Sequence, residues 1–189
     1  RQGTLPFFFL SWEHHLPKGV VGIISPWNYP LALSISDAIP ALMAGNAVIL
    51  KPDVQTSFTA LWVAELFERA GLPIDLFQIV TGDGRVVGPL LIDAVDFVTF
   101  TGNTATGRIV AQQCARRLIG CALELGGKNA MLILPDANLD RAVQSAVQGA
   151  FASSGQLCVS FERLYIHQDI FDEFVKRFVT ATKKLKLGN

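Results

Sequence analysis

Short apolar runs alternate with longer segments of helical periodicity along most of the chain, and this alternation limits the fold more than any other feature. The runs over residues 20–25, 47–51 and 96–100 indicate buried strands, because each is short and mostly apolar. Further strands are expected over residues 76–80, 122–125, 130–134 and 164–167. Helices are expected over residues 31–44 with an interruption at Pro40, 57–70, a segment ending near residue 94, 104–118, 139–153 and 170–185. The alternation favours an α/β fold, a doubly wound and mostly parallel sheet with helices on both faces.

Polar motifs stand where three of these strands end, and ligands bind at such ends in doubly wound sheets. The segment Pro26-Trp27-Asn28-Tyr29-Pro30 follows the first strand, Lys51 ends the second, and residues 100–107 join a strand to a helix through Gly102 and Gly107. Each motif alone also has a structural interpretation, as a proline-rich turn, a solvated lysine or simple turn chemistry. The N-terminus of the helix 104–118 supplies free N–H groups for an anion, although the three-glycine dinucleotide fingerprint is absent.

Composition excludes several classes of function. The chain has 189 residues, half of them hydrophobic, with a formal net charge of zero, so nothing indicates nucleic acid or an anionic membrane as a partner. The apolar run over residues 5–10 is too short for a membrane span, which needs about 20 residues. Three cysteines without a disulfide or zinc spacing indicate a reducing compartment, and we expect a cytoplasmic protein without a metal site.

The segment from Glu124 to Cys158 carries the residues with the most chemical potential. A carboxylate and a thiol are a base and a nucleophile, which covalent catalysis on a carbonyl requires. Taken alone, a cysteine is more often a small buried hydrophobe and a glutamate at a strand end is more often solvated. Gly126 and Gly127 beside the glutamate, and Gly155 before the cysteine, permit close approach of backbone or ligand. Cys114, in a predicted helix, and Cys121, before a predicted strand, are interpreted as structural.

Several motifs in order resemble the aldehyde dehydrogenase family. Glu124-Leu125-Gly126-Gly127-Lys128 resembles its general-base motif, Gly155-Gln156-Leu157-Cys158 its nucleophile motif, and Pro26-Trp27-Asn28-Tyr29-Pro30 its oxyanion motif. The resemblance implies that Cys158 attacks an aldehyde while Asn28 and the backbone N–H of Cys158 hold the oxyanion. After hydride transfer to the nicotinamide, Glu124 activates the water that hydrolyses the thioester.

The resemblance also implies NADP or NAD as cofactor. The residues expected to bind it are Ser25, Pro26, Trp27, Lys51, Val54, Gly82, Gly102, Asn103 and Leu125. In the family the lysine of the Lys-Pro pair binds the adenosine ribose, and many relatives that use NAD have glutamate three residues later. Val54 stands there, so a 2′-phosphate meets no carboxylate and we expect NADP to be favoured.

The resemblance is strongest to bacterial NADP-linked succinate-semialdehyde dehydrogenases, which makes succinate semialdehyde the expected substrate. Many such enzymes have an arginine in the helix after the asparagine motif to bind the substrate carboxylate, whereas here residues 33–37 read Leu-Ser-Ile-Ser-Asp. A general aldehyde specificity, a coenzyme A-acylating relative and a non-catalytic nucleotide-binding fragment therefore remain as alternatives. Glu124 argues against the acylating enzyme, because that enzyme needs no water-activating base.

Members of the family are considerably longer than this chain, and both ends look cut. We expect residues 1–17 to form a strand of the oligomerisation region, followed by a turn at Pro17. Residues 18–126 are expected to form a Rossmann-like cofactor domain, and residues 127–189 the incomplete start of an α/β catalytic domain. The resemblance implies a homodimer or homotetramer for the complete protein.

Overall fold

The computed structural model describes residues 12–188 and divides into two compact units, Arg1–Glu124 and Leu125–Asn189. The predicted domain boundary lies close by, between Gly126 and Gly127. The strand expected over residues 1–17 falls largely outside the described residues, and residues 12–18 have no regular secondary structure. No helix within residues 12–188 is long and apolar enough to cross a membrane.

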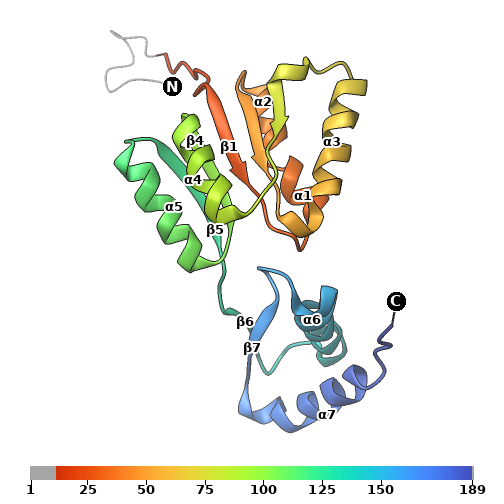
Figure 1. The fold of residues 1–189 in the computed structure, drawn as a ribbon. Helices are drawn as coiled ribbons and strands as arrows, with labels where there is room; N and C mark the ends of the chain where they lie inside the picture. The colour runs from red at the N-terminus through yellow and green to blue at the C-terminus, as the bar shows by residue number, and fades with distance from the viewer. Residues whose placement is uncertain (1–11, 189) are drawn as a thin grey trace. The chain divides into compact units, whose positions relative to one another are not determined.

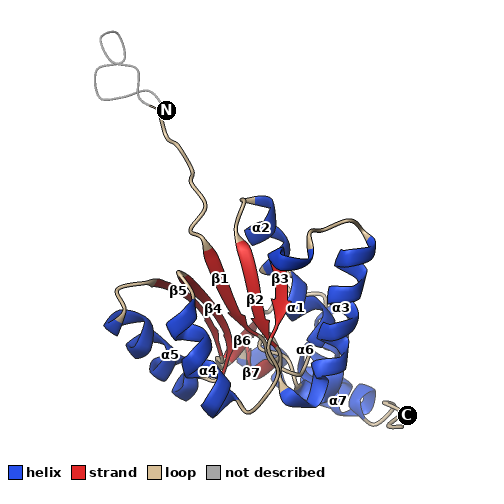
Figure 2. Ribbon diagram, turned by 45° about the horizontal axis from the view of Figure 1, so that its top comes forward, coloured by secondary structure: helices blue, strands red, loops and turns tan. Residues whose placement is uncertain are grey.

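The first unit is built on a five-stranded sheet in the order β3-β2-β1-β4-β5 (Figures 1 and 2). The strands are β1 (Val20–Ile24), β2 (Ala47–Lys51), β3 (Phe77–Ile79), β4 (Phe97–Gly102) and β5 (Gly120–Leu125). The pairs β1–β2, β1–β4 and β2–β3 are parallel. The chain runs from β1 outward to β2 and β3 on one side of the sheet, and from β4 outward to β5 on the other. The strand order therefore reverses between β1 and β4, and ligands of doubly wound sheets bind at the carboxyl ends of strands beside such a switch point.

Helices cover both faces of this sheet, as the doubly wound prediction requires. The helices are α1 (Pro30–Ile35), α2 (Ala38–Met43), α3 (Ser57–Arg69), α4 (Gly84–Ala94) and α5 (Thr104–Arg116). On one face Val21 and Ile23 join a buried cluster with residues of α2 and α3. On the other face, a Cβ at Gly22 would lie 3.0 Å from the side chain of Val95 and 3.3 Å from that of Leu91. The strands are apolar on both faces because helices bury both faces of the sheet.

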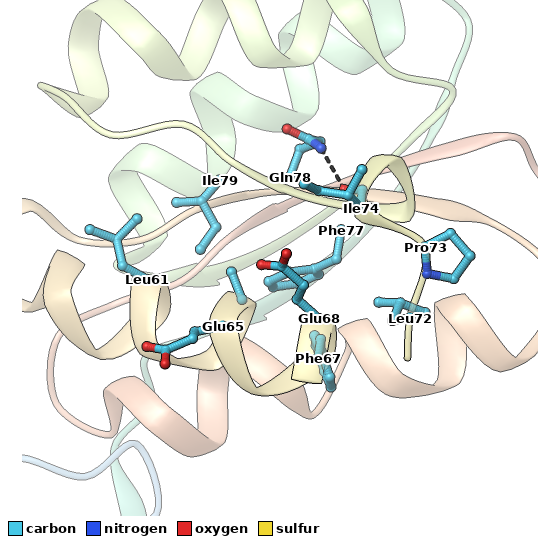
Figure 3. A pocket seen from close by; sticks show the side chains of 11 residues that line it. Leu61, Glu65, Phe67, Glu68, Leu72, Pro73, Ile74, Phe77, Gln78 and Ile79 are labelled. Atoms are coloured by element: carbon cyan, nitrogen blue, oxygen red, sulfur yellow. Dashed lines mark hydrogen bonds between the residues drawn. The ribbon is translucent and has the colours of Figure 1, made fainter. Parts of the chain in front are cut away.

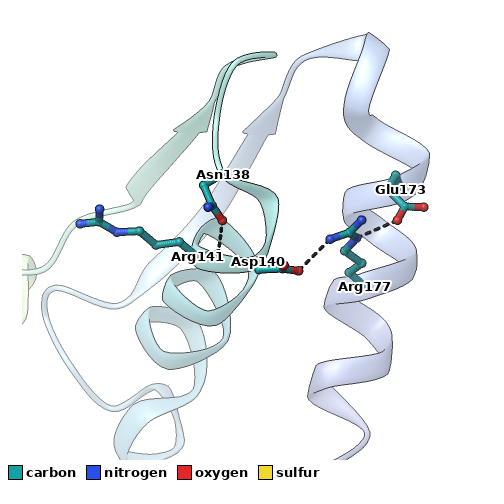
Figure 4. A network of polar contacts seen from close by, with 5 residues as sticks. All are labelled: Asn138, Asp140, Arg141, Glu173 and Arg177. Carbon is teal, nitrogen blue, oxygen red and sulfur yellow. Dashed lines mark hydrogen bonds and ion pairs between the residues drawn. The ribbon is translucent and has the colours of Figure 1, made fainter.

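The second unit contains two parallel strands, β6 (Asn129–Ile133) and β7 (Phe161–Ile166), and two helices, α6 (Leu139–Phe151) and α7 (Phe171–Thr182). Its core joins Ile133 of β6, Val143 of α6 and Phe174 of α7. Arg177 of α7 donates from Nη1 to Asp140 Oδ1 and from Nε to Glu173 Oε1, both at 2.7 Å, and so links the two helices (Figure 4). The side chain of Asn138 accepts from Arg141 N at 3.0 Å and caps α6.

The helix predicted over residues 31–44 is instead two short helices, α1 and α2, and the break falls at Ser36–Asp37 rather than at Pro40. Pro40 is the third residue of α2, where a missing backbone N–H costs little because the first turn of a helix has no internal acceptor for it. Gly45 ends α2 with φ +85, a left-handed conformation that favours glycine. Thr56 occupies the cap position of α3 without a capping hydrogen bond from its side chain.

Other corrections concern element ends near the predicted site. Helix α6 ends at Phe151, two residues earlier than predicted, and a short 3₁₀ segment follows at Ala152–Gly155. Strand β7 begins at Phe161 rather than at residue 164. Cys121 lies inside β5, not before it, whereas Cys114 is in α5 as predicted. Glu65 and Arg69 form an ion pair one turn apart on α3, with Nη1 and Oε1 3.9 Å apart.

Candidate active site

Three of the predicted cofactor segments lie at the carboxyl ends of β1, β2 and β4, which are neighbours in the sheet. Ser25 follows β1 directly and is buried, and its backbone N–H donates to Lys51 O at 3.1 Å. Its hydroxyl lies 3.4 Å from the hydroxyl of Ser34 on α1. The residue before the oxyanion motif is therefore fixed to both β2 and α1.

Lys51, the last residue of β2, is a buried cation at this edge of the sheet, with 5% of its surface exposed. Its ammonium donates to Pro52 O at 2.9 Å, and a Cβ at Gly84 would lie 3.7 Å from Nζ. Burial lowers the pKa of Lys51, and the nearby carboxylates of Asp53 and Asp83 oppose this shift. An ammonium carries three N–H groups, so Lys51 is suited to hold hydroxyl or phosphate oxygens of a nucleotide.

Val54 and Gly82 lie in the two segments that follow β2 and β3. Val54 begins the 3₁₀ turn Val54–Thr56 and is exposed at 57% of its surface. Gly82 has φ +140, and a Cβ there would stand 2.7 Å from Val87, so only glycine fits. Asp83 caps α4 and pairs with Arg85, whose guanidinium hydrogen bonds hold the pKa of the Asp83 carboxyl at about 2.

Gly102 and Asn103 join β4 to α5. The side chain of Asn103 accepts a hydrogen bond from Thr106 N at 2.8 Å and so caps the 13-residue helix α5. The remaining N–H groups of its first turn face the same end of the sheet as Lys51 and Ser25, since they follow the carboxyl end of β4. This arrangement can accept an anionic group.

The predicted catalytic residues of the first unit are Asn28 and Glu124. Asn28 is partly buried in the connection between β1 and α1, beside Trp27, which exposes 40% of its surface. Glu124 is exposed near the end of β5. A Cβ at Gly126 would meet nothing within 4 Å, so packing within the described residues does not require a glycine there and leaves room for a ligand.

Cys158 lies in the second unit, on a turn that follows α6 and the 3₁₀ segment Ala152–Gly155. It is exposed and free, whereas the free thiol of Cys114 is buried and burial raises its pKa to about 11. Three consecutive left-handed residues precede the turn: Ser153 (φ 50), Ser154 (φ 58) and Gly155 (φ 74). The backbone conformation thus favours glycine at position 155, where the sequence interpretation explained it by close approach.

The residues that hold this turn were missed by the sequence interpretation. Asn129 Nδ2 donates to Cys158 O at 2.6 Å and to Ser160 O at 3.0 Å. Lys128 forms an ion pair with Glu162. Lys128 and Asn129 directly follow Gly126 and Gly127 of the base motif. The only sign of their role in the sequence is that two polar residues stand together at the start of a strand.

A separate pocket lies between α3 and β3 in the first unit (Figure 3). Its volume is about 360 Å³, and its lining includes Phe67, Phe77 and the carboxylates of Glu65 and Glu68. It contains none of the predicted site residues. Within residues 12–188, no group of histidine, cysteine and acidic side chains is arranged to hold a metal ion.

Comparison with known proteins decides the family. The model of the aldehyde dehydrogenase family matches residues 9–189. The chain belongs to the aldehyde dehydrogenase family. This aldehyde dehydrogenase chain is 53% identical, over 99% of its length, to a Mycolicibacterium smegmatis protein named "Putative succinate-semialdehyde dehydrogenase [NADP(+)]", of which it covers 36%.

Solved structures of the family agree with the fold. A crystal structure of an E. coli NADP-dependent enzyme superimposes with a TM-score of 0.90 at 41% identity, covering 92% of this chain and 37% of the other. An NAD-dependent benzaldehyde dehydrogenase from Corynebacterium glutamicum gives 0.86 at 40% identity, covering 92% and 39%. The aldehyde dehydrogenase chain described here therefore spans just over a third of the length of these relatives.

Proposed function

We propose that the protein oxidises an aldehyde to a carboxylic acid with NADP or NAD, and that this chain supplies the cofactor site, the nucleophile and the general base. The observation that carries the proposal is Cys158, an exposed free thiol on a turn held by hydrogen bonds. Family membership supports it, because Cys158, Glu124 and Asn28 lie in segments that resemble the family's nucleophile, general-base and oxyanion motifs.

In the proposed reaction the thiolate of Cys158 attacks the carbonyl carbon of the aldehyde and forms a thiohemiacetal. The carbonyl oxygen becomes negative in this step, and the side-chain amide of Asn28 and the backbone N–H of Cys158 donate to it. A single donor of this kind typically contributes about a hundredfold or more in rate. Lys51 and the first turn of α5 bind and orient the nucleotide.

When bound, the nicotinamide cofactor supplies the oxidant that accepts hydride, which leaves a thioester on Cys158. Glu124 then takes a proton from water, the resulting hydroxide attacks the thioester carbon, and the C–S bond breaks to release the carboxylic acid and the Cys158 thiolate. The exposed position of Glu124 in β5 lets water reach its carboxylate.

For the cofactor we propose a preference for NADP. Val54 presents no carboxylate to a 2′-phosphate, and Lys51 offers a positive charge close by. The names of the relatives include both cofactors, NADP for the M. smegmatis and E. coli proteins and NAD for the C. glutamicum enzyme.

For the substrate we propose succinate semialdehyde, by similarity to the M. smegmatis protein at 53% identity. Helix α1 has no cation among residues 30–35 to bind the second carboxylate of that substrate, so a cationic residue elsewhere must do so. Because α1 lacks such a cation, a broader aldehyde specificity is the alternative to succinate semialdehyde. The proposal extends to a cytoplasmic homodimer or homotetramer, as the family resemblance implies.

The test is Cys158→Ala in the protein as its gene encodes it, assayed by NADPH formation with succinate semialdehyde and with benzaldehyde. We expect turnover to be lost while the dissociation constant for NADP changes less than about twofold, because the thiol serves only the chemistry. Cys121→Ala is the matched control and keeps activity. Near-normal turnover in Cys158→Ala would refute the assignment.

A further inference from the structure

Cys158 lies on a tight turn whose backbone is held by a side chain from outside the turn. Ser160 N donates to Leu157 O at 3.1 Å and closes the turn. Asn129, the first residue of β6, donates from Nδ2 to Cys158 O and to Ser160 O, at 2.6 and 3.0 Å. A primary amide nitrogen carries two N–H groups, so both donors of Asn129 are engaged on this turn.

The backbone before Cys158 has an uncommon conformation. Ser153 and Ser154 adopt left-handed conformations, which carry a cost for residues other than glycine, and Gly155 continues this conformation. Cys158 and Val159 are exposed and contribute little packing, whereas Ser160 is buried at 4% exposure. The buried Ser160 and the two hydrogen bonds from Asn129 both hold the turn.

The pairing of β6 with β7 explains why Asn129 reaches this turn. Asn129 pairs with Phe161, but the next residue, Ala130, pairs with Arg163, so Glu162 is an extra residue in β7. Such irregularities redirect side chains and are common beside active sites. The carboxylate of Glu162 forms an ion pair with Lys128. The adjacent residues Lys128 and Asn129 therefore hold the two ends of the Cys158–Glu162 segment, Lys128 at Glu162 and Asn129 at Cys158.

We propose that Asn129 is a positioning residue for the reaction proposed above. By holding the carbonyl of Cys158, it fixes the peptide plane after the nucleophile, and the closed turn then leaves little freedom to the plane before it. That second plane carries the Cys158 N–H, the donor assigned to the oxyanion. Asn129 therefore acts through the main chain of Cys158 and does not touch the substrate.

The experiment compares Asn129→Ala and Asn129→Asp in the protein as its gene encodes it, after Cys158→Ala has been shown to abolish turnover. Asp keeps the size of Asn but its carboxylate donates no hydrogen bond and repels the two carbonyl oxygens. Asn138→Ala is the matched control, because it removes a helix cap in the same unit and lowers stability without touching the turn. The measurements are kcat, KM for NADP, melting temperature and the rate of Cys158 alkylation by iodoacetamide between pH 6 and 9.5.

Both Asn129 variants are expected to lose about tenfold to a hundredfold in kcat, with KM for NADP within about twofold, because an ordered oxyanion donor is lost and the cofactor site is in the other unit. Alkylation at high pH should stay within about threefold of wild type, since that reaction uses no oxyanion donor. Asn138→Ala should retain kcat. Wild-type kcat in Asn129→Asp, an equal loss in Asn138→Ala, or a parallel loss of alkylation would each overturn the positioning role while leaving the Cys158 assignment intact.

Discussion

Very few residues set the charges around the proposed adenosine end of the cofactor site. Lys51 is buried and its pKa is lowered by that burial. We expect a bound phosphate to offset the cost of burying this ammonium. Val54 is exposed three residues later, in a segment whose carboxylate, Asp53, is occupied by the backbone of Gln55 at 2.9 Å. A change at residue 54 alters the local charge without disturbing the core.

Val54→Glu should shift cofactor preference from NADP toward NAD. Two charges about 4 Å apart near a protein surface interact by roughly 4 kcal/mol before solvent competition, so we expect the ratio of kcat/KM for NADP to that for NAD to fall at least tenfold. Val54→Gln has the same length without the charge and is expected to retain the wild-type ratio. If Val54→Glu left the ratio unchanged, residue 54 would lie away from the ribose.

For single residues, the sequence predicted where the site residues lie in the fold better than it predicted which side chains surround them. The strand-end positions of Ser25, Lys51 and Asn103 followed from the alternating pattern, because parallel strands present their carboxyl ends at one edge. The hold of Asn129 on Cys158 could not be predicted, since it depends on a register shift between β6 and β7 that no periodicity reveals. The assignments of Asn28, Glu124 and Cys158 to catalysis stay predictions until the substitutions are made.

At the scale of elements, helix α6 packs closely against strand β7 through Gly149. A Cβ at this position would stand 2.4 Å from the ring of Phe161, the residue that pairs with Asn129. No such approach exists at Gly88 in α4, where a Cβ would meet nothing within 4 Å outside its own helix. The two helical glycines therefore have different reasons for being glycine.

Alanine substitutions at these glycines should have different effects on stability. Gly149→Ala is expected to destabilise by about 1–3 kcal/mol, because the Phe161 ring must move, and to reduce kcat through the displaced turn. Gly88→Ala is expected to change stability by less than about 1 kcal/mol, because the gain in helix propensity is opposed by contact between the new Cβ and the ring of Pro89, the next residue of α4. Urea unfolding followed by circular dichroism measures both. A stabilised Gly149→Ala would show that β7 yields without strain.

Element boundaries were the part of the fold that sequence predicted least well. Pro40 was expected to interrupt a helix, but its place in the first turn of α2 makes it compatible with one. The end of α6 was placed too late because Ala152 and Ser153 continue an apolar and small-residue pattern, while the backbone turns left-handed at Ser153. Burial and backbone conformation decide such ends, and neither is a property of a short window of sequence.

For the whole molecule, we expect cofactor binding to be linked to folding, because the proposed cofactor residues Ser25, Lys51 and Asn103 lie in the first unit. A ligand that binds only the folded protein adds about 2.7 kcal/mol to unfolding at a hundred times its dissociation constant. We expect the melting temperature to rise steadily with NADP concentration. Lys51→Met should remove most of this rise without lowering the melting temperature of the unliganded protein, because it replaces a buried charge.

Lys18→Met is the control for this linkage. Lys18 is exposed and precedes the amino end of β1, opposite the predicted cofactor edge, so its variant should keep the full response to NADP. Scanning calorimetry at a series of NADP concentrations makes the comparison. A full response in Lys51→Met would place the nucleotide away from the end of β2.

The order of strands in the first unit also affects how the sheet can form during synthesis, because β1 pairs with a strand that is made much later. Strand β1 pairs with β2 on one side and β4 on the other, and Val20 N donates to Asp96 Oδ2 across 76 residues of sequence. At synthesis rates of about 5–20 residues per second, the 73 residues from Ile24 to Phe97 (97 − 24) take about 4–15 s to emerge. Throughout that interval the central strand has one unpaired apolar edge on the ribosome, and a chaperone or a neighbouring nascent chain can bind it there before β4 does.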